Sequence, residues 1–167
     1  ADVEVGSIFD PEFSDRSGNN PVGDTNSYVT PFYMFDDDLL YLAVSTFAYE
    51  PQEPYTLRVE RYTPLSIASG ETVTVPLAVE TISNFLTFEG SEDQDITITT
   101  NAPENIDPEI ALFDPDGRVI AVESGADGIH DLELRENGTY ILQVYPGGCG
   151  LIELSNLGDV EVTLELE

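Results

Sequence analysis

Apolar and polar residues alternate at a period of two along much of this chain. The clearest run lies near its C-terminal end, where every second residue is apolar: Val160, Val162, Leu164 and Leu166. Successive side chains of a β-strand point to opposite faces, so this period predicts strands with one buried face and one solvated face. No window of the sequence has a helical period over three turns. The chain is therefore predicted to be all-β.

Turn signals separate the alternating runs at short intervals. They are glycine-containing pairs that favour tight turns: Ser69-Gly70, Asp116-Gly117, Asp127-Gly128, Asn137-Gly138 and Gly158-Asp159. Short strands punctuated in this way are typical of two antiparallel sheets packed face to face. We therefore expect an antiparallel β-sandwich with a jelly-roll-like order of strands.

The first third of the chain echoes its last third. Phe9-Asp10-Pro11 matches Phe113-Asp114-Pro115, and the apolar run at residues 40–44 matches the run at residues 139–144. An echo of this kind predicts one complete β-unit preceded by part of another. We expect a partial unit at residues 1–63, with a long polar loop at residues 14–26, and a complete sandwich at residues 64–167.

The charge balance is strongly acidic. The chain has 33 Asp and Glu against 5 basic residues, which are all Arg, and its formal net charge is -28. Without a basic patch it has no means of displacing counterions from a phosphate backbone, so nucleic acid is excluded as a partner. High salt, divalent cations, or an extracellular matrix that contains both would suit such a surface.

Three further features bear on the compartment. No apolar run approaches the ~20 residues that span a bilayer, so membrane insertion is not expected. Cys149 is the only cysteine, so no disulfide forms within the chain. The start Ala1-Asp2-Val3 would suit a mature N-terminus left after cleavage at a small residue. We expect an extracellular or cell-surface location.

Four motifs from Gly70 onward follow one another in an order that resembles the bacterial pre-peptidase C-terminal domain. They are Gly70-Glu71-Thr72-Val73, Phe85-Leu86-Thr87-Phe88-Glu89-Gly90, Leu112-Phe113-Asp114-Pro115-Asp116-Gly117-Arg118-Val119 and Gly138-Thr139-Tyr140-Ile141-Leu142-Gln143-Val144. The resemblance covers residues 70–167 and implies a jelly-roll-like accessory module without catalytic activity, which in some members binds calcium or a substrate. Residues 151–158 depart from the family pattern, because they separate the last strand from Gly150.

Two acidic clusters are candidate calcium sites, since calcium takes oxygen ligands from carboxylates and carbonyls. One is the run Asp36, Asp37 and Asp38, and the other is the pair Asp114 and Asp116. Each has a simpler interpretation: a solvated loop for the first, and a turn built by Pro115-Asp116-Gly117 for the second. Calcium is the one cofactor that the sequence suggests.

Catalytic machinery is not apparent in the sequence. The sole histidine, His130, lies in an alternating run that places it on one face with Leu132 and Leu134. No nucleophile elbow, paired cysteines, lysine or glycine-rich phosphate loop accompanies it. The chain is therefore predicted not to be an enzyme.

The leading hypothesis is self-association. The N-terminal residues read as a strand that could be added to an open sheet edge of a neighbouring subunit, and its apolar positions are Val3, Val5, Ile8 and Phe9. This predicts a homo-oligomer or polymer that serves as a subunit of an extracellular filament or surface layer.

The alternative is an accessory module that targets a secreted enzyme to polysaccharide or protein, with or without calcium. Aromatic residues concentrated in the first half of the chain could then stack on sugar rings, although aromatic residues in strands more often belong to a core.

Overall fold

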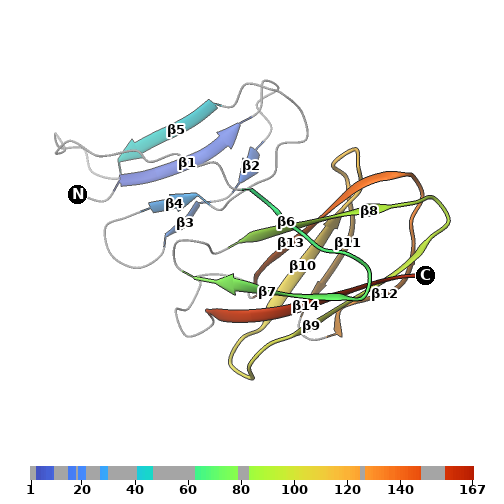
Figure 1. Cartoon of the computed structure of the whole chain (residues 1–167). Coiled ribbons are helices and arrows are strands. Elements are labelled where there is room, and N and C mark those ends of the chain that lie inside the picture. Colours follow the sequence, from blue (N-terminus) through green and yellow to red (C-terminus); the bar gives the residue numbers. More distant parts are fainter. Residues whose placement is uncertain are drawn as a thin grey trace. The chain divides into compact units, whose positions relative to one another are not determined.

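The computed structural model describes residues 63–78, 83–124, 127–147 and 157–167 in full, and the backbone of five strands within the first 46 residues. The chain divides into two compact units, Ala1–Tyr62 and Thr63–Glu167. Figure 1 shows the strands of each unit. Among the described residues no helix is long and apolar enough to cross a membrane.

The first unit contains a three-stranded antiparallel sheet in the order β2-β1-β5 and a separate pair, β3-β4. Its strands are β1 (Val3–Phe9), β2 (Asp15–Ser17), β3 (Asn19–Pro21), β4 (Ser27–Val29) and β5 (Tyr41–Thr46). The prediction of a continuous loop at residues 14–26 is wrong, because β2 and β3 lie within it. Pairing with neighbouring strands overrides a polar composition that disfavours strands.

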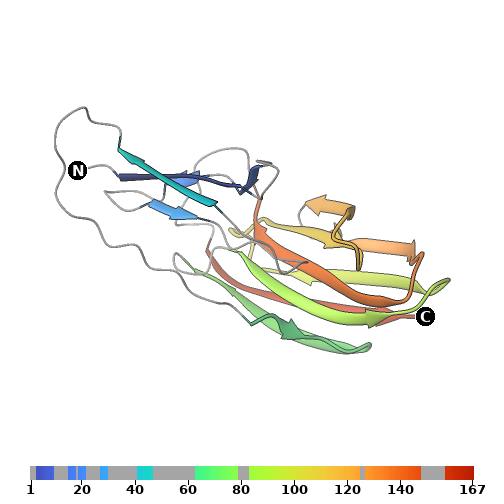
Figure 2. The same cartoon turned by 90° about the horizontal axis from the view of Figure 1, so that it is seen from above.

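The second unit is a sandwich of two sheets (Figure 2). The five-stranded sheet has the order β11-β10-β13-β8-β6, and the four-stranded sheet has the order β12-β9-β14-β7. Its strands are β6 (Leu65–Ser66), β7 (Glu71–Leu77), β8 (Asn84–Gly90), β9 (Asp95–Asn101), β10 (Pro108–Phe113), β11 (Val119–Ser124), β12 (Ile129–Glu133), β13 (Gly138–Pro146) and β14 (Gly158–Leu166). All the strand pairs are antiparallel except β6 with β8. The predicted all-β antiparallel sandwich is confirmed.

The hydrophobic core lies between the two sheets. Leu86, Leu142 and Leu112 line up across β8, β13 and β10 and are fully buried. From the other sheet, Ile98 and Val162 are also fully buried. The alternation seen in the sequence of β14 thus gives the strand one core-facing side, as predicted.

The outer face of the five-stranded sheet is also apolar. Side chains alternate along β10 and β13, so the neighbours of the core residues Leu112 and Leu142 point away from the core. These neighbours include Ala111 and Ile141, and both are buried. Phe85, next to the core residue Leu86, is buried as well. This sheet therefore has apolar residues on both faces, as the nearly continuous apolar runs of its strands indicate.

The outer face of the four-stranded sheet is polar. Its exposed side chains hydrogen-bond across strands: the hydroxyls of Thr72 and Thr163 lie 2.7 Å apart. The Asn101 amide donates to Glu161 over 2.8 Å. This face is the ordinary solvated side of an antiparallel sheet.

Candidate functional site

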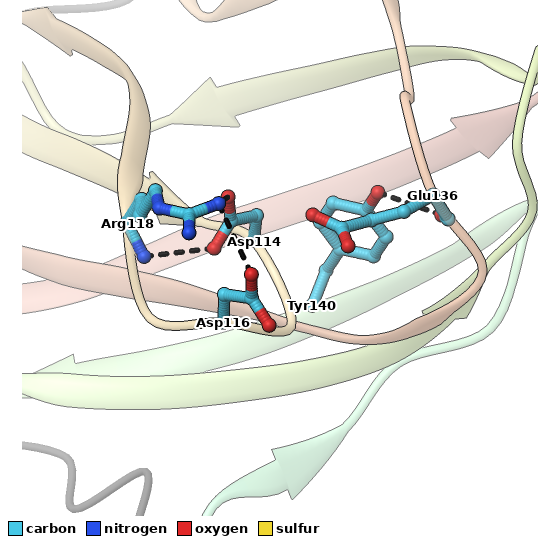
Figure 3. Close-up of polar contacts among 5 residues, drawn as sticks. All are labelled: Asp114, Asp116, Arg118, Glu136 and Tyr140. Atoms are coloured by element: carbon cyan, nitrogen blue, oxygen red, sulfur yellow. Dashed lines mark hydrogen bonds and ion pairs between the residues drawn. The ribbon is translucent and has the colours of Figure 1, made fainter.

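The hairpin between β10 and β11 is closed by Asp114 (Figure 3). This buried carboxylate accepts the backbone N–H of Arg118 at 2.8 Å. The backbone N–H of Asp114 donates to the Arg118 carbonyl at 2.9 Å, and the N–H of Gly117 donates to the Asp114 carbonyl at 3.0 Å. Gly117 has a φ of +83°, which a residue with a side chain rarely adopts. The motif Asp114-Pro115-Asp116-Gly117 therefore builds a tight turn, as its composition indicates.

Asp114 and Asp116, a predicted calcium pair, both lie close to the positively charged side chain of Arg118. The Arg118 guanidinium lies 3.0 Å from a carboxylate oxygen of Asp116 and 4.0 Å from one of Asp114 (Figure 3). A calcium ion bridging the two carboxylates would have to displace this exposed side chain. Within the described residues no group of three or more His, Cys, Asp or Glu side chains is arranged to hold a metal ion. Calcium at this turn stays a prediction.

Tyr140 anchors the segment between β12 and β13 to the core. Its ring is fully buried and stacks on Phe88, with ring centroids 5.5 Å apart. Its hydroxyl donates to the Glu136 carbonyl at 2.8 Å (Figure 3). Burial raises the pKa of the Tyr140 phenol, and the negative charges of Glu136 and Asp114 raise it further. The phenol is thus a structural group that stays protonated at neutral pH.

His130 differs from the prediction. Asp131 has a φ of +51°, and the pairing of β12 with β9 shifts register between Ile129 and Leu132. This irregularity breaks the alternation, so Leu132 packs against the core whereas His130 is exposed. Ring nitrogen Nε2 of His130 lies within hydrogen-bond distance of the Asp127 carbonyl. The expectation that His130 shares a face with Leu132 is therefore wrong.

Other predicted sites lie partly or wholly outside the described residues. Asp36, Asp37, Asp38 and Cys149 are outside them. The proposed self-association strand is β1, whose backbone is described. Val3, Val5, Ile8 and Phe9 pair with β5, and the last two also pair with β2. Donation of this strand to another subunit stays a prediction, and it would require β1 to leave its own sheet.

Among the strands that the structure describes, four are edges of the sandwich, and three of these are poorly suited to pairing with another chain. β6 is only two residues long. β7 contains Pro76, which lacks a backbone N–H to donate. β12 is interrupted by the irregularity at Asp131. Short strands, prolines and irregular backbone are the devices by which proteins protect open sheet edges.

β11 is the fourth edge, and it is open and apolar. It is six residues long, and among the described strands it pairs with β10 alone. Val119, Ile120 and Val122 are 53%, 38% and 48% exposed. Val122 pairs with Ala111 and Val119 with Phe113, so both lie on the apolar outer face of the sheet. The sequence predicts an apolar strand after the Asp116-Gly117 turn, and β11 confirms it. Sequence reasoning did not identify this strand as an exposed edge, although the run Val119-Ile120-Ala121-Val122 does not alternate with polar residues.

The β11 edge is regular over only part of its length. Leu112 pairs with Ala121 and Phe113 with Val119, so Ile120 is an extra residue in a bulge. Glu123 pairs with the buried residue Ile110 and adds a charge toward the core side of the edge. Both features weaken strand addition without blocking it, and they leave residues 121–124 with regular pairing geometry.

Comparison with known proteins establishes similarity in fold. No family model matches the sequence, and no curated protein matches it. Among solved structures, the chain is similar to the periplasmic lysozyme inhibitor of g-type lysozyme, PliG, from Aeromonas hydrophila. The identity is 13%, the match covers 63% of this chain and 96% of that chain, and the TM-score is 0.51.

A second match is the pre-peptidase C-terminal domain of collagenase from Bacillus anthracis, with 16% identity and a TM-score of 0.49. It covers 65% of this chain and 100% of that domain. This domain belongs to the family that the order of motifs in the present sequence resembles.

Proposed function

We propose that this protein is a noncatalytic β-sandwich that acts by self-association at the cell surface or outside the cell, as a subunit of a filament or surface layer. The observation that carries the proposal is β11, an edge strand with three exposed aliphatic side chains. An unprotected apolar edge is a template for pairing with another strand, and such edges are normally blunted in proteins that stay monomeric. The other three edges of this sandwich are blunted.

The charge of the chain sets the conditions for association. At a formal charge of -28, two copies repel each other in dilute buffer. Salt near physiological strength shortens the reach of this repulsion to ~8 Å, and molar salt shortens it to ~3 Å. Association through an apolar strand should therefore strengthen as salt rises. PliG, which shares the fold, is periplasmic, and an extracellular location for this chain is consistent with that setting.

Light scattering across a series of protein and salt concentrations tests the proposal. We expect the mean mass of the wild type to exceed that of a monomer and to rise with both concentrations. Val122→Lys should keep the protein monomeric, because it places a charge on the apolar edge.

Thr74→Lys is the matched control, since Thr74 is an exposed strand residue on β7 and the change in charge is the same. It should associate like the wild type. A wild type that is monomeric under every condition would refute the proposal and would favour the alternative, an accessory module for another protein or for polysaccharide.

Repeating the series with calcium and then with a chelator tests the acidic sites. Calcium would be assigned to the first unit by three results together. Chelation lowers the mean mass of the wild type, chelation lowers the mean mass of Asp114→Asn in the same way, and chelation has no effect on a variant in which Asp36, Asp37 and Asp38 are replaced. Equal mean masses with calcium and with chelator would show that calcium has no role in the assembly.

A further inference from the structure

We propose that β11 pairs with β11 of a second copy of this chain, antiparallel, about a two-fold axis that passes through the pair of Ala121 residues. The inference rests on the proposed self-association and specifies which surfaces meet and with what symmetry. It makes the first assembled species a closed dimer.

The order of residues along β11 is complementary to itself in this arrangement. In an antiparallel pair related by a two-fold axis, the residue at the axis lies opposite its own copy. With Ala121 at the axis, Ile120 of each copy lies opposite Val122 of the other. Both residues are exposed in the isolated chain, and cross-strand aliphatic pairs of this kind stabilise sheets. Alanine at the centre lets the two backbones approach without a clash of large side chains.

The charges on β11 favour a second copy in the antiparallel direction. Residues 118–122 contain no acidic residue. Arg118 precedes the strand and Glu123 lies near its end. Antiparallel pairing places Arg118 of one copy beside the end that carries Glu123 of the other, at both ends of the contact. Parallel pairing would instead set like charges side by side.

The arrangement has a consequence for assembly. Two five-stranded sheets joined through β11 form one continuous sheet of ten strands, with β6 at both outer edges. A two-fold contact uses the same surface on both copies and closes on itself. Growth beyond the dimer therefore needs a second surface. The bulge at Ile120 limits the regular pairing to a short stretch, so the dimer should be weak in dilute buffer and should be favoured by salt.

Disulfide trapping tests the symmetry directly. In a Cys149→Ser background, Ala121→Cys places one thiol in each copy opposite the other, where the Cα atoms of paired strands are about 4.5–5.5 Å apart. This separation lies within the range that a disulfide bridges. Under mild oxidation, we expect Ala121→Cys to form covalent dimers about tenfold or more faster than Thr74→Cys on β7, because pairing raises the effective thiol concentration. The rate should also rise with salt.

The outcomes separate this inference from the proposed function. Fastest trapping at Ile120→Cys or Val122→Cys would overturn the axis at Ala121 and would place it at that residue. Trapping no faster than Thr74→Cys at every β11 position, in a protein that still exceeds monomer mass, would overturn the β11 dimer and leave self-association through another surface. A Cys149→Ser protein that stays monomeric would overturn both. Unfolding of each cysteine variant by urea verifies that it is folded.

Discussion

The two sheets of the sandwich differ most on the faces that point away from the core. On the four-stranded sheet this face carries Thr72, Thr163 and Glu161, which hydrogen-bond to one another or to neighbouring polar side chains. On the five-stranded sheet the equivalent face carries Phe85 and Ile141, and both are buried. The polar residues of the first face are solvated, whereas these apolar residues of the second face are shielded from water.

This difference explains why the candidate site is at β11. The apolar outer face of the five-stranded sheet extends from β8 through β13 and β10 to the edge, where Val119 and Val122 remain exposed. The four-stranded sheet ends at β7 and β12 with a proline and a backbone irregularity. A sheet with two apolar faces and an open edge is suited to association, and a sheet with a solvated face and protected edges is not.

The largest expected effect comes from truncating the buried outer face. Ile141→Ala should lower the free energy of unfolding by about 2–5 kcal/mol, the range for deleting a buried aliphatic side chain. Its neighbour Leu142 points into the core, and Leu142→Ala should cost a similar amount. Urea unfolding followed by circular dichroism measures both. A loss below about 0.5 kcal/mol for Ile141→Ala, typical of a surface position, would break the comparison between the two outer faces.

A smaller effect is expected at alkaline pH from Tyr145, which lies on the same outer face. Its hydroxyl donates to the Glu109 carboxylate at 2.9 Å. Burial raises the pKa of this phenol well above its usual value, and the bond to Glu109 and the charge of that residue raise it further. Because the pKa of the folded state is the higher one, the stabilisation is complete below the unfolded value near pH ~10 and is lost as the pH rises above it.

The loss should approach about 1.4 kcal/mol for each pH unit while the unfolded phenol ionises and the folded one does not. Tyr145→Phe removes this contribution, so its stability should fall less steeply with pH in that range. Unfolding curves measured between neutral and strongly alkaline pH compare the two proteins. Identical slopes for both would show that Tyr145 is not desolvated on this face.

The smallest effect belongs to the solvated face. Thr163→Ala removes the side-chain hydrogen bond to Thr72, but water replaces it, so the free energy of unfolding should change by no more than about 0.5 kcal/mol. The same urea series measures it. A cost comparable to that of Ile141→Ala would show that the two outer faces do not differ in the way described.

Much of the fold could be predicted because it depends on local patterns. The alternation in β14 fixed which residues face the core, and the Asp116-Gly117 pair predicted the hairpin that Asp114 closes. Prediction failed where pairing or backbone strain intervened. The polar stretch at residues 14–26 contains strands because neighbouring strands supply its hydrogen bonds. His130 changed face because Asp131 adopts a left-handed conformation that a period of two does not reveal.

The candidate site illustrates the same division. The apolar run at residues 119–122 and the acidic charge are properties of the sequence alone. The apolar run predicts a strand, which the structure confirms, and the charge predicts that the chain does not bind nucleic acid. Sequence reasoning assigned self-association to the N-terminal strand, because a partial first unit suggested an incomplete sandwich that such a strand could complete in a neighbouring subunit. Only the tertiary structure decided that β1 is paired on both sides, that three edges of the sandwich are protected, and that β11 is not. Which strand becomes an edge depends on the order in which distant segments pair, and a local pattern of residues carries no record of that order.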